Sequence, residues 1–297
     1  MSLRLGIDLG GTKTEILVLG NDGAEQWRHR IATPRNYEAL IAALRELVLQ
    51  GDSQAGGPCS VGMAIPGTEA LGSGLIKNAN TVYLNGKPLG IDLEAALGRP
   101  VRLSNDANCF VLSEATDGAA AGATAAFGVI AGTGLGGGVY VNERVLTGAH
   151  GVAGEWGHIP LPGMSAEELA EAPDCYCGKR GCLETWCCGP AFSADYKRHG
   201  GDDATAGDIA ASDAPAAKAA LARLTDRLAR GLATVVNILD PDVIVLGGGL
   251  SNIDALYRDL PPLVERYGFT LGGPPRIVKN QHGDSSGVRG AAWLWPA

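Results

Sequence analysis

The chain begins with apolar residues at every second position, the pattern of a half-buried β-strand. These residues are Leu3, Leu5, Ile7 and Leu9. The tract Asp8-Leu9-Gly10-Gly11-Thr12-Lys13 then supplies turn-forming glycines, and a second apolar strand covers residues 15–19. Asn21-Asp22-Gly23 forms another tight turn before a third strand at 24–31. The sequence therefore predicts a hairpin with glycine and threonine at its tip.

Helical and extended patterns alternate through the rest of the chain. Apolar residues recur on one helical face over 37–50, and a polar turn region is expected at 51–58. Pro241 ends a long helical pattern, because proline cannot continue a helix. The other expected strands are 61–65, 101–103, 125–131, 139–141 and 243–246. The other expected helices are 109–115, 215–239, one from about 252 and a final one after 287. The capping box of Ser165 and Glu168 also predicts a short helix.

A second glycine-rich turn repeats the first. Strand 125–131 leads through Gly132, Thr133 and Gly134 into a returning strand at 139–141. The literal GxGxxG spacing does not predict dinucleotide binding, because that fingerprint opens a helix and here a strand follows. Glycine amides and a threonine hydroxyl at a hairpin tip can hold a phosphate. Each turn alone could be a plain glycine hairpin, but their repetition favours a nucleotide site.

Composition and charge narrow the class of protein. The 297 residues are 45% hydrophobic and 19% charged, which is typical of a soluble globular protein with room for two domains. A formal net charge of −8 gives no footprint for nucleic acid or an anionic membrane. The uncharged stretch 118–142 holds eight glycines, which favours packed, turning structure over a membrane span. An early Asp8 argues against a signal peptide, so we expect a cytoplasmic protein.

Four potential ligands of a soft or borderline metal lie close together in the sequence. They are His158, Cys175, Cys177 and Cys182. Gly178 and Gly181 let the backbone bend so that thiolates converge. Three cysteines and one histidine suit a closed, structural tetrahedral Zn²⁺ site. Buried or disulfide-forming cysteines are the alternative, although disulfides are not expected without an export signal. The remaining cysteines are expected to fill the core: Cys59, Cys109, Cys187 and Cys188.

Two carboxylates flank this cluster. Glu155 precedes the histidine and Glu184 follows the last cysteine, so folding the segment around a metal would bring them together. If one ring nitrogen of His158 binds the metal, the other can donate a hydrogen bond. Glu155, His158 and Glu184 would then suit a polyhydroxylated ligand. The alternative is that both glutamates are ordinary surface acids.

The stretches GEWGH and CYCGKRGCLE resemble the signature of the ROK family of bacterial sugar kinases and repressors, in which it carries both the zinc and the sugar site. The resemblance covers nearly the whole chain. It implies an α/β fold of two actin-like (ribonuclease H-like, hexokinase-type ATPase) domains with an active-site cleft between them. The expected domains are a small one from 1–117 closed by the C-terminal helix of 285–297, and a large one from 118–284 with the zinc knot and nucleotide site.

The resemblance also implies ATP and Mg²⁺ as cofactors. Asp8 would help to hold Mg²⁺ through water. The residues expected at the nucleotide are Gly10, Gly11, Thr12, Lys13, Thr133, Gly134, Gly248 and Gly249. A strand followed by a triple glycine and a helix independently favours nucleotide contact at the last two. Lys13 has the alternative of a solvated strand start.

The residues expected at the sugar are Asn80, Asn105, Asp106, Glu155, His158 and Glu184. Asparagine clusters such as the one around Asn80 more often form turns. Asp106 matches the family's catalytic base, and Asn105 matches an asparagine bound to the sugar. Because phosphoryl transfer needs an oriented nucleophile and a late proton acceptor, an aspartate suits this role. The structural alternative is that Asp106 is the N-cap of the following helix.

The implied reaction is transfer of the ATP γ-phosphoryl group to a hexose hydroxyl. The stretches KNANTVYLNGKPL, GEWGHIPLP and HGDSSGVRGAAWLW look most like the family's proteobacterial fructokinases, which also accept mannose, so fructose phosphorylated at O6 is the predicted acceptor. N-acetylglucosamine kinases, which usually read GEFGH, and glucokinases are alternatives.

A non-catalytic sugar-binding protein and a repressor are alternatives of another class. The family's repressors carry a basic DNA-binding domain first, whereas a strand begins here by Leu3. The expected partners are a hexose, ATP and a second copy in a homodimer, with no nucleic acid and no membrane.

Overall fold

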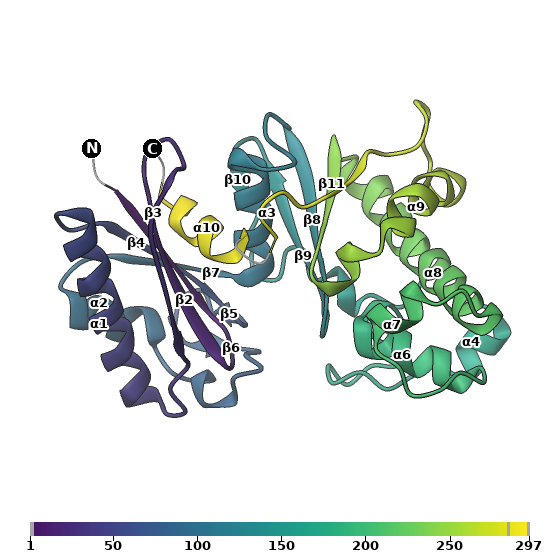
Figure 1. Cartoon of the computed structure of the whole chain (residues 1–297), viewed down its shortest axis with the longest axis horizontal. Helices are drawn as coiled ribbons and strands as arrows, with labels where there is room; N and C mark the ends of the chain where they lie inside the picture. Colours follow the sequence, from purple (N-terminus) through teal and green to yellow (C-terminus); the bar gives the residue numbers. More distant parts are fainter. Residues whose placement is uncertain (1–2, 284–285, 296–297) are drawn as a thin grey trace. The chain divides into compact units, whose positions relative to one another are not determined.

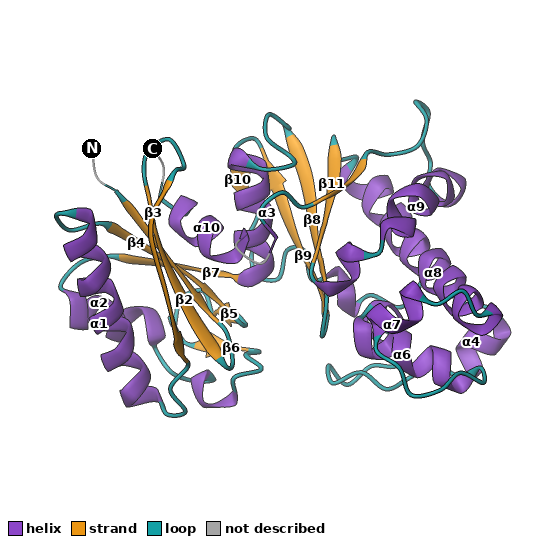
Figure 2. Ribbon diagram, in the orientation of Figure 1, coloured by secondary structure: helices purple, strands orange, loops and turns teal. Residues whose placement is uncertain are grey.

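The computed structural model describes residues 3–283 and 286–295. The chain forms two compact units: unit 1 comprises Met1–Ala121, Arg144–Ala153 and Asp284–Ala297, and unit 2 comprises Gly122–Glu143 and Gly154–Gly283. Each unit combines a β-sheet with helices, so the predicted α/β fold class is confirmed (Figure 1, Figure 2). The expected boundaries differ from these units at 118–121, 144–153 and 284, which belong to unit 1. Within the described residues, no helix combines the length and apolarity needed to cross a bilayer.

Unit 1 is built on a sheet whose strands run in the order β3-β2-β1-β4-β7. The β1–β2 and β2–β3 pairs are antiparallel, and the β1–β4 and β4–β7 pairs are parallel. The elements of unit 1 are β1 (Arg4–Leu9), β2 (Lys13–Leu19), β3 (Glu25–Ala32), α1 (Tyr37–Ala55), β4 (Ser60–Ile65), β5 (Thr68–Glu69), β6 (Ile76–Lys77), the 3₁₀ turn η1 (Val82–Leu84), α2 (Leu89–Leu97), β7 (Val101–Asn105), α3 (Asp106–Asp117), β10 (Arg144–Val145) and α10 (Ser286–Trp293).

The alternation of β2 explains why helices cover both faces of this sheet. Ile16 and Val18 belong to a core shared with α1 and α2, whereas Leu17 and Leu19 pack with Val288 and its neighbours in α10. All four strand side chains are fully buried. Burial of each of these side chains stabilises the folded state by roughly 1.5–3 kcal/mol.

The approach of α10 to the sheet requires glycines. A Cβ added at Gly6 would overlap the carbonyl oxygen of Val288, and one at Gly62 would overlap that of Ala291. Gly290 of α10 has the same relation to the carbonyl of Cys109 in α3. The helix therefore lies at backbone contact with β1, β4 and α3. It belongs to unit 1.

The second sheet has the strand order β10-β9-β8-β11-β12, and its strands β9, β8, β11 and β12 belong to unit 2. The β8–β9 pair is antiparallel, and the β8–β11 and β11–β12 pairs are parallel. The elements of unit 2 are β8 (Ala125–Ala131), β9 (Leu135–Val141), the 3₁₀ turn η2 (Trp156–His158), α4 (Ala166–Ala170), α5 (Glu184–Cys187), α6 (Gly189–Arg198), α7 (Ala206–Ala211), α8 (Pro215–Leu239), β11 (Val243–Gly247), the 3₁₀ turn η3 (Gly249–Asn252), α9 (Asp254–Tyr267) and β12 (Ile277–Lys279).

One large core joins the sheet of unit 2 to its helices. Phe127 of β8 and Ile244 of β11 share this core with Leu228 of α8, Leu260 of α9 and Trp186 of α5. The hairpin β8–β9 beside the parallel strand β11 has the same arrangement as β1–β2 beside β4 in unit 1. The repeated hairpin that the sequence indicates is therefore present in both units.

Several predicted elements differ from the structure at their ends. The helix predicted at 37–50 continues to Ala55, so the polar turn region predicted to begin at 51 was wrong. The strand predicted at 139–141 begins at Leu135, and the helix predicted from about 252 begins at Asp254 after a 3₁₀ turn. Helices α2, α5, α6 and α7 were not predicted.

Candidate functional site

The first predicted phosphate turn lies between β1 and β2. Gly10 N donates to the Lys13 carbonyl at 3.0 Å, and the Thr33 hydroxyl donates to the Gly10 carbonyl at 2.7 Å. Thr33 N also donates to the Thr12 carbonyl at 3.0 Å. Gly11, Thr12 and Lys13 are exposed. The carbonyls of Gly10, Thr12 and Lys13 thus accept hydrogen bonds from within the protein, while the tip of the turn faces solvent.

Asp8 and Asp106 lie at one edge of the unit 1 sheet. Strands β1, β4 and β7 are parallel neighbours, so their carboxyl ends meet at the same edge. Asp8 stands near the end of β1, and Asp106 follows β7 directly. Burial, and then the negative charges of Asp106 and Glu15, raise the pKa of Asp8 to about 7. Two carboxylates that repel each other in this way suit a divalent cation between or beside them.

The N-cap of α3 is Asn105, not Asp106. The Asn105 side-chain oxygen accepts from Ala107 N at 2.9 Å, and its amide donates to the Gly67 carbonyl at 3.2 Å. The structural alternative considered for Asp106 was therefore wrong by one residue. Asp106 is instead the first residue of the helix. Its side chain is exposed, which leaves it accessible to a ligand.

Asn80 lies in a loop whose backbone is fixed by hydrogen bonds from the side chain of Asn85. Asn85 both accepts from Ala79 N and donates to the Ala79 carbonyl, each at 2.9 Å, and so fixes the backbone beside Asn80. Asn80 itself is exposed. A Cβ at Gly11 would lie 3.5 Å from the hydroxyl oxygen of Thr81. Unit 1 therefore brings the loop of Asn80 against the first glycine turn. Asn85 and Thr81 were not among the predicted site residues.

The two glycine segments predicted for the nucleotide in unit 2 lie side by side. A Cβ at Gly132 would lie 3.8 Å from Gly249 N, and one at Gly248 would lie 2.6 Å from the Ala131 carbonyl oxygen. Gly248 has a positive φ of 76°, which favours glycine. Thr133 and Gly134 form the adjoining turn between β8 and β9. These residues were predicted from separate stretches, and the pairing of β8 with β11 unites them.

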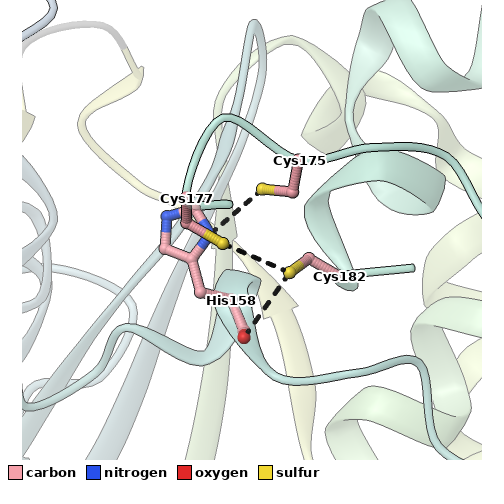
Figure 3. Close-up of side chains that lie close together, drawn as sticks. All are labelled: His158, Cys175, Cys177 and Cys182. Atoms are coloured by element: carbon pink, nitrogen blue, oxygen red, sulfur yellow. Dashed lines mark hydrogen bonds between the residues drawn. The ribbon is translucent and has the colours of Figure 1, made fainter. Parts of the chain in front are cut away.

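The four predicted metal ligands converge in unit 2 (Figure 3). The donor atoms of His158, Cys175, Cys177 and Cys182 all lie within 4.8 Å of one another. His158 Nδ1 is 3.5 Å from the Cys175 sulfur, and the sulfurs of Cys177 and Cys182 are 3.6 Å apart. Donors bound tetrahedrally to one zinc ion stand about 3.5–3.8 Å apart. The donor set and its spacing therefore fit zinc.

The backbone around the cluster is folded into a tight loop. Asp174 and Arg180 form an antiparallel bridge, and Cys175 N donates to the Lys179 carbonyl at 2.8 Å. Gly178 and Gly181 have positive φ values of 85° and 67°, as their predicted role in the bend requires. The loop thus turns the three cysteines toward His158.

The same loop is fixed to α8 at a second place. Glu168 completes the predicted capping box with Ser165 at the start of α4. Its carboxylate also accepts from Arg227 at 2.9 Å and Arg230 at 2.7 Å. Hydrogen bonds from these arginines lower the pKa of Glu168 to about 2 despite the opposing effect of its burial. Arg227 is only 4% exposed and also pairs with buried Asp195. Charge pairing therefore holds the loop against the core of unit 2.

Glu155, His158 and Glu184 form a polar group at the edge of the cluster of predicted metal ligands. Glu155 Oε2 lies 4.0 Å from His158 Nε2. Glu184 Oε2 accepts from Leu135 N at 2.9 Å, directly after the glycine turn. The exposed Tyr176, which the sequence analysis missed, places its hydroxyl 2.8 Å from His158 Nε2. A tyrosine between two cysteines predicted to bind metal gave no signal, because its exposure depends on the folded loop.

Trp156 of the GEWGH stretch lies in the core and does not face this group. It is 6% exposed, and its indole N–H donates to the Gly136 carbonyl at 3.0 Å. Its ring packs edge-on against Phe127 with ring centres 5.4 Å apart. A difference between tryptophan and phenylalanine at this position would act through packing.

The whole chain resembles proteins of one family. A profile of the ROK family matches residues 4–297. The chain belongs to the ROK family. It is 42% identical over 296 residues to an N-acetyl-D-glucosamine kinase of Pectobacterium atrosepticum, with 97% of each chain covered.

Two solved ROK structures share the fold. The ROK hexokinase of Thermus thermophilus superposes with a TM-score of 0.85 at 32% identity, covering 98% of this ROK chain and 96% of the hexokinase. The ROK glucokinase of Streptomyces griseus, solved with glucose and AMPPNP, superposes with a TM-score of 0.79 at 26% identity, covering 99% of each. This ROK chain therefore has the two-domain α/β architecture of hexokinase-type sugar kinases, as the sequence resemblance implied.

Proposed function

We propose that this ROK chain is an ATP-dependent hexose kinase. The observation that carries the proposal is the placement of two carboxylates, Asp8 and Asp106, at one edge of the unit 1 sheet beside an exposed glycine turn. Phosphoryl transfer needs a group that orients the attacking hydroxyl and accepts its proton, and a second group that holds a divalent cation. Asp106 suits the first role because it is exposed at a helix N-terminus.

The other predicted residues take supporting roles. Asp8 would hold Mg²⁺, which neutralises phosphate charge when bound. The nucleotide is assigned to Gly10 and the exposed tip Gly11-Thr12-Lys13, to the turn at Thr133 and Gly134, and to Gly248 and Gly249. The hexose is assigned to Asn80, Asn105, Asp106, Glu155, His158 and Glu184. His158, Cys175, Cys177 and Cys182 would hold a zinc ion that fixes the loop of the sugar-binding groups.

The identity of the hexose has two candidates. The relatives named N-acetyl-D-glucosamine kinase, at 40–42% identity, favour N-acetylglucosamine. This supports the alternative acceptor over fructose, which the sequence analysis put first. Fructose stays the second candidate on the resemblance of KNANTVYLNGKPL, GEWGHIPLP and HGDSSGVRGAAWLW to fructokinases. The buried position of Trp156 removes direct sugar contact as the basis of that second assignment.

The test is ADP release with Mg-ATP against N-acetylglucosamine, fructose, mannose, glucose and N-acetylmannosamine. The highest kcat/KM identifies the acceptor among these candidates. The Asp106→Asn variant is expected to lower kcat by about 10²- to 10⁴-fold, the usual contribution of a general base. Its KM for the sugar should change only a few-fold.

Asp254→Asn is the matched control. Asp254 is also an exposed first residue of a helix, α9, so its substitution removes the same charge from an equivalent place. Turnover of this control should be unchanged. Wild-type protein that releases no ADP with any of the sugars would refute the kinase, and full turnover by Asp106→Asn would refute the assigned base.

A further inference from the structure

Two buried threonines lie directly behind the first glycine turn. Thr33 follows β3 and is 8% exposed, and Thr14 in β2 is fully buried. The Thr33 hydroxyl donates to the Gly10 carbonyl at 2.7 Å, and the hydroxyl oxygens of the two threonines are 2.9 Å apart. Neither threonine is among the residues assigned to the nucleotide or the sugar. The turn is therefore in contact with a buried pair of hydroxyl groups.

The direction of both hydrogen bonds follows from the number of protons. A hydroxyl has one proton to donate, and a carbonyl oxygen can only accept. The Thr33 proton is used on the Gly10 carbonyl, so the Thr14 hydroxyl donates to the Thr33 oxygen. The result is a chain of two hydrogen bonds that runs from Thr14 through Thr33 to Gly10. In such a chain each bond polarises the next one and strengthens it.

The bond to the Gly10 carbonyl also sets the direction of the next amide. The Gly10–Gly11 peptide is trans, and in a trans peptide the C=O and the following N–H point to opposite sides. Because the Gly10 oxygen points toward buried Thr33, the Gly11 N–H points to the exposed side of the turn. Within residues 3–283 and 286–295, no group accepts a hydrogen bond from Gly11 N. The turn thus presents an oriented donor to solvent.

Thr33 fixes the same turn through its backbone as well. Thr33 N donates to the Thr12 carbonyl at 3.0 Å, and Gly10 N donates to the Lys13 carbonyl at 3.0 Å. The backbone is therefore held on both sides of Gly11. A substitution of Thr33 that keeps its backbone N–H and removes its hydroxyl would release only the Gly10 carbonyl.

The two glycines of this peptide make its orientation depend on a partner. The peptide can rotate with little steric cost, because neither Gly10 nor Gly11 carries a Cβ. Rotation by half a turn would exchange the positions of the Gly10 oxygen and the Gly11 N–H. Glycine is itself required at position 10, since a Cβ there would lie 2.7 Å from the Lys13 carbonyl oxygen. A backbone that is open enough for a phosphate therefore needs a side chain elsewhere to select one peptide orientation.

We propose that Thr33 is a positioning residue for the nucleotide, and that its hydroxyl holds the Gly10–Gly11 peptide so that the Gly11 N–H meets a phosphate oxygen. The proposal rests on the proposed kinase function, which assigns Gly11 to the nucleotide. A donor that is oriented before binding costs little to order when the phosphate arrives. In the rotated peptide, the Gly10 oxygen would face the phosphate in place of the N–H and repel it.

The experiment is binding of Mg-AMPPNP by calorimetry without sugar, using the full-length protein. Thr33→Val keeps the branched shape and the backbone N–H and removes the hydroxyl. It should weaken Mg-AMPPNP binding by about 10-fold, the effect of losing one hydrogen bond to a charged group. Thr33→Ser restores the hydroxyl and should bind within a few-fold of wild type. The KM for the sugar should be the same in all three proteins, because the substitution acts on the nucleotide turn.

Thr14→Val tests the same chain of hydrogen bonds with Thr33 in place. It removes the donor to Thr33 but leaves the bond to Gly10, so binding should weaken less than in Thr33→Val. The double variant should bind no more weakly than Thr33→Val, because both hydroxyls act on one carbonyl. Multiplied effects of the two substitutions would overturn the proposal, since the two hydroxyls would then act separately.

Thr225→Val is the matched control. Thr225 is 3% exposed, and its hydroxyl donates to the Leu221 carbonyl at 2.8 Å, so the change removes the same kind of buried hydrogen bond in unit 2. Nucleotide affinity of this control should be unchanged. Wild-type affinity in Thr33→Val would overturn the proposal. Equal weakening in Thr33→Val and Thr33→Ser would also overturn it, because the shape of the side chain would then matter and the hydroxyl would not.

The two proposals fail in different ways. A wild-type protein that binds no Mg-AMPPNP and phosphorylates none of the five sugars above refutes the kinase function, and the role of Thr33 with it. A wild-type protein that phosphorylates a sugar, together with a Thr33→Val variant of unchanged nucleotide affinity, refutes only the role of Thr33.

Discussion

Replacing Cys182 by serine tests whether a metal ion holds the loop of unit 2. Cys182 is fully buried, and its sulfur faces that of Cys177 at 3.6 Å. A bound ion would join His158 to Cys182 and close a segment of about 25 residues. By the chain-entropy relation for cross-links, closing a loop of about that length stabilises the folded state by about 3 kcal/mol. Loss of the ion in Cys182→Ser should therefore lower the stability by about that amount.

The assay combines metal analysis with thermal unfolding. Wild-type protein should contain one zinc per chain by mass spectrometry of the metal, and Cys182→Ser should contain almost none. For the unfolding of a unit of the size of unit 2, a loss of about 3 kcal/mol corresponds to a Tm lower by roughly 6–12 °C. A chelator that removes zinc from wild type should produce a similar shift, and it should shift Cys182→Ser no further.

Cys187→Ser is the control for this experiment. Cys187 is as deeply buried in unit 2 but lies outside the cluster. The control can lose stability through packing, but it should retain zinc and its response to the chelator. The reasoning would be refuted if Cys182→Ser kept a full zinc content, or if wild type unfolded at the same temperature with and without chelator.

Two further variants test unit 1. The raised pKa of Asp8, about 7, means that the folded chain keeps a proton that the unfolded chain loses above about pH 4. The free energy of unfolding of the wild type should therefore fall as pH rises from about 4 to 7, and Asp8→Asn should not show this fall. In urea unfolding at pH 8 without Mg²⁺ or nucleotide, Asp8→Asn should be more stable than wild type by on the order of 2 kcal/mol. Parallel pH profiles of stability for the two proteins would contradict this prediction. Gly290→Ala should cost at least about 3 kcal/mol or prevent folding, because its Cβ would overlap the Cys109 carbonyl. Gly57→Ala, where a Cβ meets open space, should change Tm little, and equal stability of the two variants would disprove the packing argument.

Sequence patterns predicted the repeated hairpins and the metal-donor cluster because both are local. In the hairpins, the apolar alternation and the glycine turns lie within about 15 residues of one another. In the cluster, two glycines with positive φ let three cysteines converge within eight residues. Local chemistry of this kind needs no knowledge of distant contacts.

The errors came from glycines whose role depends on packing. The sequence predicts a turn starting at Gly51, but this residue lies within α1, where glycine is needed because a Cβ would lie 2.6 Å from Leu5 Cδ1. The sequence also places Gly137 in a turn, but this residue lies within β9, where a Cβ would meet Trp156 and Phe127. A glycine that is required by close packing inside a helix or strand cannot be distinguished in the sequence from a glycine that ends one.

The sequence predicts which residues belong to the candidate site, but not how their side chains are arranged. Asn105 and Asp106 both follow a strand and precede a helix, and only the observed hydrogen bonds show which of them is the cap. The position of Tyr176 over His158 depends on a side-chain contact between residues 18 apart in the chain. Such contacts leave no periodic trace in the sequence.

The close docking of α10 on β1 and β4 has a consequence for synthesis on the ribosome. Val288 and Ala292 cover Leu17 and Leu19, yet they emerge about 280 residues after β1. At about 5–20 residues per second, the apolar face of the first hairpin stays uncovered for on the order of 15–60 s. The whole of unit 2 leaves the ribosome during that interval, before unit 1 has its last helix. The nascent chain therefore presents an apolar strand face that a holding chaperone can bind until α10 has been synthesised.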